Sequence, residues 1–163
     1  MKRDIGYLLL IIIMGAILCL AMLALTDVAM ADGEETVYVL CNPESYVNIR
    51  EKPSKRSHQA GFAYCGDDFR TDGRTKNGFL HVFAGTETGE GWISTGFIVY
   101  CKPEKVDEVW TVESNGRVAV RSTIGGKRSR WLKNGDSVKV YYVAEVAVTG
   151  VGFVDAEYVS PKQ

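Results

Sequence analysis

The sequence is poor in the residues that build metal centres and nucleophilic sites. Its 163 residues contain four cysteines and two histidines, His58 and His81. No two cysteines are spaced as C-x-x-C, so the sequence has neither a zinc pattern nor a redox motif. A cysteine peptidase would have to use Cys65 with one of the two histidines, and the sequence offers no helix N-terminus that would lower the pKa of the thiol. We therefore expect no catalytic residue, no metal, no cofactor and no enzymatic activity.

The sequence also lacks an excess of charge of either sign. Its formal net charge is −1, so there is no global basic field of the kind that attracts nucleic acid. One stretch that contains no acidic residue concentrates positive charge: Arg117, Arg121, Lys127, Arg128, Arg130 and Lys133. This stretch is either a solvated loop face or an anion-binding patch. Trp131 lies within it and is a candidate contact for an anionic polymer or a membrane surface.

A long apolar run is confined to the N-terminus. Residues 5–25 carry no charge, and Lys2 and Arg3 precede them. Ala29 and Ala31 place small residues where a signal peptidase reads the chain. We predict a signal peptide over residues 1–31; the alternative is an uncleaved membrane anchor, because the run approaches the length that spans a bilayer. In both cases the remaining chain is directed outside the cytoplasmic membrane, to be secreted or held at the cell surface.

The rest of the chain has the sequence pattern of short β-strands separated by turns. Apolar or alternating runs are broken by Gly, Asn, Asp and Pro, and no long helical stripe is present. The predicted strands cover residues 37–41, 47–49, 61–65, 69–71, 79–83, 91–94, 110–113, 118–121, 137–143, 145–148 and 152–155. This pattern predicts an all-β protein of small barrels or sandwiches.

Four short motifs occur twice in the same order, which indicates an internal duplication. They are V-N-I-R at 47–50 and V-A-V-R at 118–121, Gly-Asp at 66–67 and 135–136, G-W-I-S at 91–94 and G-F-V-D at 152–155, and an aromatic-aliphatic pair at 97–98 and 158–159. The offset between copies shrinks along the repeat, so the first copy carries a longer connection.

The order of these motifs resembles the bacterial SH3 domain (SH3b). The resemblance implies two tandem small SH3-like β-barrels after an N-terminal hydrophobic export helix. Domain 1 would cover residues 37–102, a linker residues 103–109 and domain 2 residues 110–161. The second copy departs from the pattern, with Phe153 in the place of the usual tryptophan.

The same resemblance implies a non-catalytic binding function. SH3b domains commonly recognise peptidoglycan, especially its peptides, so the expected partner is a peptidoglycan peptide or another cell-surface component. The alternative is a structural or adaptor role in which the barrels bind a protein partner. Nucleic acid is not expected, and a membrane is expected only through the N-terminal segment if it is uncleaved.

Aromatic residues of the first copy are the candidate ligand contacts. SH3-like barrels bind peptides in shallow aromatic grooves, and we assign Tyr46 and Tyr64 to such a groove. Arg50 would form a structural salt bridge or bind a ligand carboxylate. Trp92 is a further candidate, although Trp92 and Phe97 are both expected to point into the barrel.

Cys41 and Cys101 bracket the first repeat. Because the chain ends of SH3-like barrels run close together, the resemblance makes a disulfide between them reasonable, with Cys65 left as a buried free thiol. The alternative is that all three cysteines stay reduced.

Overall fold

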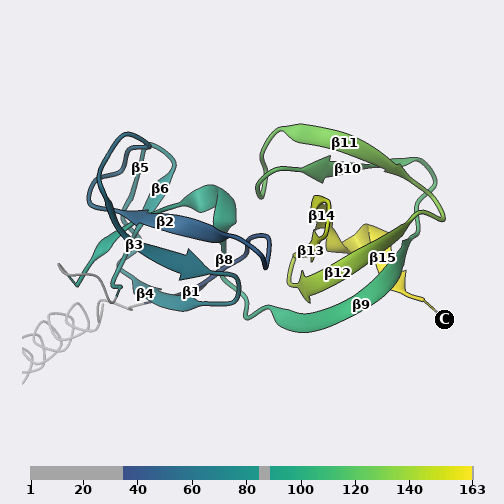
Figure 1. Ribbon diagram of the computed structural model, residues 1–163, viewed down its shortest axis with the longest axis horizontal. Helices are drawn as coiled ribbons and strands as arrows, with labels where there is room; N and C mark the ends of the chain where they lie inside the picture. The colour runs from purple at the N-terminus through teal and green to yellow at the C-terminus, as the bar shows by residue number, and fades with distance from the viewer. Residues whose placement is uncertain (1–34, 85–88, 163) are drawn as a thin grey trace, which may run out of the picture. The chain divides into compact units, whose positions relative to one another are not determined.

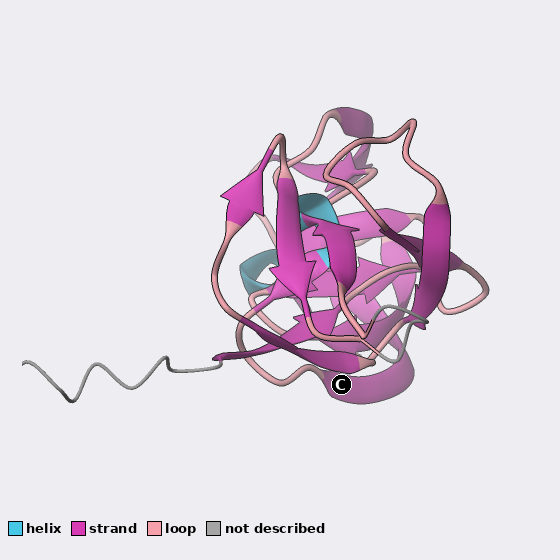
Figure 2. Ribbon diagram, turned by 90° about the vertical axis from the view of Figure 1, so that its left-hand side faces the viewer, coloured by secondary structure: helices cyan, strands magenta, loops and turns pink. Residues whose placement is uncertain are grey.

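The computed structural model describes residues 35–84 and 89–162 (Figure 1). The predicted signal peptide, residues 1–31, lies outside these residues. Residues Glu34–Gln163 form one compact unit. In the described part of the chain, helical structure is limited to two single turns, η2 (Thr95–Phe97) and η3 (Ala156–Tyr158), as Figure 2 shows. Neither turn has the length or apolarity to cross a membrane. The all-β prediction is confirmed.

The N-terminal half, residues 35–99, contains two antiparallel sheets. The first has the order β4-β1-β8: β4 (Asp68–Thr71), β1 (Glu35–Val39) and β8 (Ile98–Val99). The second has the order β3-β2-β7-β6-β5: β3 (Gln59–Tyr64), β2 (Tyr46–Arg50), β7 (Gly91–Ser94), β6 (Phe79–Val82) and β5 (Thr75–Lys76). A bridge between Arg70 and Phe83 connects the two sheets.

The C-terminal half, residues 104–162, contains one antiparallel sheet of seven strands. Its order is β11 (Arg128–Lys133), β10 (Arg117–Arg121), β14 (Gly152–Asp155), β13 (Val146–Thr149), β12 (Ser137–Val143), β9 (Glu104–Val112) and β15 (Val159–Pro161). Strand β10 pairs with β11 and β14 as β2 pairs with β3 and β7.

Each half has its own apolar core, built by alternation along the strands. In β2 the side chains of Val47 and Ile49 are buried, and in β10 those of Val118 and Val120 are. Burying each such side chain contributes about 1.5–3 kcal/mol. A third cluster joins the halves: Leu40 and Val99 come from the first, and Val148 and Phe153 from the second.

The two Gly-Asp turns are closed by the same hydrogen bonds. Gly66 and Gly135 have φ angles of +93° and +84°, which favour glycine. Each glycine N–H donates to the strand that opens its half, and each aspartate carboxylate accepts from the backbone three residues earlier. The pairs are Gly66 N to Val39 O (2.8 Å), Gly135 N to Val112 O (2.8 Å), Tyr64 N to Asp67 Oδ2 (2.8 Å) and Lys133 N to Asp136 Oδ2 (2.7 Å).

The linker and strand β11 differ from the sequence expectation, as do the short strands β5, β8 and β15, which the sequence pattern did not indicate. The predicted linker, residues 103–109, is mostly strand, because β9 begins at Glu104 and pairs with β12 as far as Val143. Strand β11 was not predicted at all. Only Leu132 of its six residues is buried, so its sequence has no apolar alternation, and its extended form depends on pairing with β10.

Candidate functional site

Three aromatic side chains are exposed on the outer face of β2 and β3. Tyr46 and Tyr64 lie opposite each other on the two strands, and Phe62 lies two residues before Tyr64 on β3, opposite Asn48. Their exposed fractions are 51%, 58% and 49%. The ring of Tyr46 contacts that of Phe62 edge-on, with centroids 4.6 Å apart. These three residues form what we call the aromatic face. Tyr46 and Tyr64 were predicted for it; Phe62 was not, although the same alternation places it there.

Asn48 lies in the middle of the aromatic face. It pairs with Phe62 across the strands, and its side-chain amide oxygen is buried without a hydrogen-bond partner. A buried acceptor without a partner costs about 1–3 kcal/mol. The aromatic face therefore includes a buried hydrogen-bond acceptor that the described part of the protein leaves unsatisfied.

Arg50 ends β2 and supports the loop that follows. Its Nη1 donates to the Ser57 carbonyl at 2.7 Å, and in the C-terminal half Arg121 Nη1 donates to the Gly126 carbonyl at the same distance. Both arginines thus bond a backbone carbonyl after their strand. This structural role differs from the predicted salt bridge, because the acceptor is a carbonyl and carries no full charge.

Trp92 does not point into the barrel, contrary to expectation. It pairs with Arg50 on one side and with His81 on the other, and it is half-buried. Side chains alternate along β7, and Ile93 is the fully buried residue of the first core. Phe97, by contrast, packs against that core.

His81 is a buried residue that the sequence analysis did not assign to any site. The residue is 2% exposed, and its ring makes edge-type contacts with the rings of Phe83 and Trp92. Nδ1 lies 3.0 Å from Asp72 Oδ2, and Nε2 lies 3.2 Å from Glu90 Oε2. The sequence alone does not indicate that His81, Asp72 and Glu90 are neighbours, because strand pairing brings them together.

Burial by itself raises the pKa of Asp72, but other interactions outweigh it. Arg74 donates to the carboxylate from its backbone N–H at 3.1 Å and from Nε at 2.6 Å, and the imidazole of His81 is nearby. The pKa of Asp72 is therefore held below its ordinary value of 3.8. A carboxylate with a lowered pKa stabilises the fold above the unfolded-state pKa, and this contribution is lost as the pH falls through the folded-state pKa.

We expect Asp72→Asn to lower stability at neutral pH and to change its acid dependence. The difference between the parent and the variant should be largest well above pH 3.8, begin to shrink as the pH approaches that value and shrink further below it. Urea unfolding midpoints between pH 2 and pH 7 measure this difference. A gap that stays constant down to pH 2 would contradict the assigned direction of the pKa shift.

The cysteines are arranged differently from the implied Cys41–Cys101 disulfide. Strands β1 and β8 are antiparallel, with Tyr38 opposite Val99, and this register carries Cys41 and Cys101 toward opposite ends of the pair. Both cysteines lie beyond the ends of these strands, Cys41 two residues after β1 and Cys101 two residues after β8. A disulfide requires Cα atoms within about 7 Å. All three cysteines in the described residues are free: Cys41 buried, Cys65 half-buried and Cys101 exposed.

Cys65 is instead the neighbour of Cys41. The backbone N–H of Cys41 donates to Cys65 Sγ at 3.3 Å. The side-chain hydrogen bond to Cys65, together with burial, raises the pKa of Cys41. The same hydrogen bond lowers the pKa of Cys65, because it favours the thiolate that accepts it.

We expect oxidation with glutathione disulfide to link Cys41 to Cys65. The two thiols would lose two protons and two electrons, and the oxidant would be reduced to two glutathione thiols. Trypsin separates the three cysteines into different peptides, so mass spectrometry can identify the bond. A Cys65→Ser variant should leave Cys41 unlinked, and a peptide joining Cys41 to Cys101 would contradict the expectation.

Trp131 occupies the matching place in the C-terminal half. It lies opposite Ala119 on β10 as Phe62 lies opposite Asn48 on β2, and its side chain is 43% exposed. Within the described residues, no group of His, Cys, Asp and Glu side chains could hold a metal ion. Cys65 and His81 belong to separate clusters, since their partners are Cys41 and Asp72 respectively.

Comparison with known proteins identifies one domain. The family described as "Bacterial SH3 domain" matches residues 45–99, which include β2 to β8. Among solved structures, NlpC1 and NlpC2 from Trichomonas vaginalis are similar at 14% sequence identity each, with TM-scores of 0.35 and 0.33. They cover 82% and 80% of this chain. The chain spans about half of their length, 48% and 49%. A search of the curated proteins finds no match.

Proposed function

We propose that this protein is a non-catalytic module that acts outside the cytoplasmic membrane and binds peptidoglycan peptides on its aromatic face. One observation carries the proposal. Within the part that matches the bacterial SH3 domain, Tyr46, Phe62 and Tyr64 are exposed together on two paired strands. Three large aromatic side chains gathered on one surface are typical of a binding site.

A peptide suits this face for two reasons. Flat aromatic rings bury much ligand area and lose little conformational entropy when they bind. They can therefore bind a flexible chain of small residues, which offers no large side chain of its own. The buried amide oxygen of Asn48, which pairs with Phe62 across the strands, lacks a donor, and a peptide backbone supplies N–H groups. A bound peptide would thus make apolar contacts with the aromatic rings and a hydrogen bond to Asn48.

The proposal extends to a tandem arrangement. The hydrogen bonds shared by the Gly66 and Gly135 turns, and those of Arg50 and Arg121, support a second domain of the same kind in residues 104–162. Phe153 replaces Trp92 there, so the second domain need not bind the same ligand.

The extracellular location rests on the sequence alone. The basic residues Lys2 and Arg3, the uncharged residues 5–25 and the small residues before Asp32 support export. A non-catalytic role is supported by the partners of Cys65 and His81, which bond Cys41 and Asp72 and not each other.

The test is co-sedimentation of residues 34–163 with purified peptidoglycan sacculi. We expect saturable binding, weakened roughly tenfold by Tyr64→Ala because an exposed aromatic contact is lost. The matched control is Tyr100→Ala. Tyr100 is 55% exposed but lies after β8, outside the aromatic face.

Two results would reject the proposal. Absence of co-sedimentation would exclude the wall as ligand and direct the search to protein partners of the aromatic face. Equal losses in the two variants would show that binding does not use this face.

A further inference from the structure

The outer face of β10 and β11 carries cations where the aromatic face carries tyrosines. Arg117 pairs with Lys133 across the strands, and the equivalent pair in the N-terminal half is Tyr46 with Tyr64. Arg121 and Arg128 pair at the bulged end of the same two strands. We call Arg117, Arg121, Arg128, Lys133 and the central Trp131 the basic face. All five side chains are exposed.

A cavity of about 500 Å³ opens on the basic face. Arg117, Arg121, Trp131 and Tyr158 line it, and Asp155 is the one acidic residue among its walls. This volume is large enough to hold a sugar residue. The cavity is therefore a concave site with an aromatic ring, two guanidinium groups and a single carboxylate.

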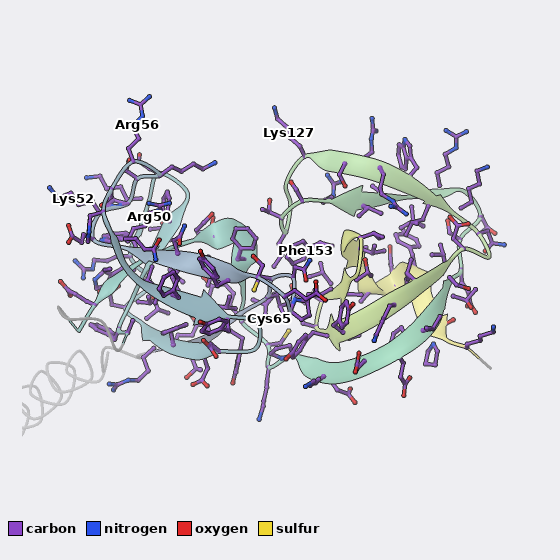
Figure 3. The ribbon with its side chains drawn as sticks, viewed as in Figure 1. Arg50, Lys52, Arg56, Cys65, Lys127 and Phe153 are labelled. Atoms are coloured by element: carbon purple, nitrogen blue, oxygen red, sulfur yellow. The ribbon has the colours of Figure 1, made fainter. Side chains whose placement is uncertain are left out.

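The positive charges of this face are not neutralised by the protein. Across the described residues, none of its four cations forms an ion pair with a carboxylate. The guanidinium of Arg128 lies 4.4 Å from the centre of the Trp131 ring, and that of Arg121 donates to the Gly126 carbonyl. Lys127, in the turn between the strands, projects outward beside them and adds to the field (Figure 3). Unpaired cations on one surface attract an anionic partner.

We propose that the basic face binds an anionic polysaccharide. Repeated acidic groups would meet Arg117, Arg121 and Lys133, while the apolar face of a sugar ring would contact Trp131. A single-stranded nucleic acid fits less well, because it stacks successive bases on several aromatic residues and this face offers Trp131 alone on its strands. The site is separate from the aromatic face and does not rest on the proposed function.

Dextran sulfate is the probe, with uncharged dextran as its control, in calorimetric titrations of residues 34–163. We expect the double variant Arg117→Gln/Lys133→Gln to weaken binding roughly tenfold. Among the described residues neither side chain forms an ion pair, and Lys133 contributes to the fold through its backbone N–H, which donates to Asp136. The matched control, Arg56→Gln/Lys76→Gln, removes the same charge from exposed positions of the N-terminal half.

Asp155→Asn supplies a change in the opposite direction. Its carboxylate makes no capping hydrogen bond to η3, so the substitution should leave the fold intact. Removing the one negative charge from the cavity should tighten dextran sulfate binding severalfold. Tyr64→Ala should have no effect on this probe.

The affinity for dextran sulfate should also fall as salt is added, less steeply for the double variant. If both double variants weakened binding equally, the loss would reflect the lower net charge of the protein and not the basic face. That result would overturn the proposal. Equal or tighter binding of a single-stranded oligonucleotide, or no binding of dextran sulfate, would overturn it as well.

Discussion

Replacing Gly152 with alanine should destabilise the protein by about 3 kcal/mol or more. Gly152 has a φ angle of +133°, where side chains are strained. A Cβ atom there would lie 2.6 Å from the Arg121 carbonyl oxygen and 2.9 Å from Val120 Cγ1. The backbone could move away from the added Cβ only if the pairing of β10 with β14 were broken. The strain therefore cannot be relieved by a small local shift.

Urea denaturation followed by tryptophan fluorescence measures this loss. Gly116→Ala is the matched control, because no atom lies within 4 Å of the added Cβ. The control should be neutral or slightly stabilising, since alanine reduces the freedom of the unfolded chain. A loss below 1 kcal/mol for Gly152→Ala would show that β10 and β14 are not held this closely.

Phe153→Ala is the second substitution with a large expected effect, about 3–5 kcal/mol. Phe153 is 5% exposed and belongs to the cluster that joins the two halves. Its ring centroid lies 6.2 Å from that of Phe97. Alanine would leave a cavity among Leu40, Val99 and Val148, and the apolar cluster that both halves share would lose its phenyl ring.

The measurement is thermal unfolding by calorimetry. The parent should unfold in one transition, because a shared apolar cluster couples the halves, and the variant should show two. Phe62→Ala removes the same ring from an exposed position and should cost less than 1 kcal/mol. An unchanged single transition in Phe153→Ala, with little loss of stability, would mean that this cluster does not couple the halves.

The two outer faces show how one arrangement of strands presents different chemistry. The strand pairs β2–β3 and β10–β11 have the same register, but aromatic side chains occupy the first and cations the second. Substitution at outward positions leaves the cores unaffected, so ligand preference can change while the fold is kept.

The sequence by itself determined the fold class and the exposure of the aromatic face. Alternation in β2 separates buried Val47 and Ile49 from exposed Tyr46, and this information is local to five residues. The Gly-Asp motifs marked turns for an equally local reason, since Gly66 and Gly135 supply the positive φ angles that those turns need.

Tertiary structure decided everything that depends on which strands meet. Antiparallel register placed Cys41 beside Cys65 and away from Cys101, and it brought Asp72 and His81 together. Pairing with β10 made a strand of the polar segment β11, and so created the basic face. Such contacts join residues far apart in sequence. Periodicity cannot encode them, because it reports which face of a strand a side chain occupies and not what lies opposite.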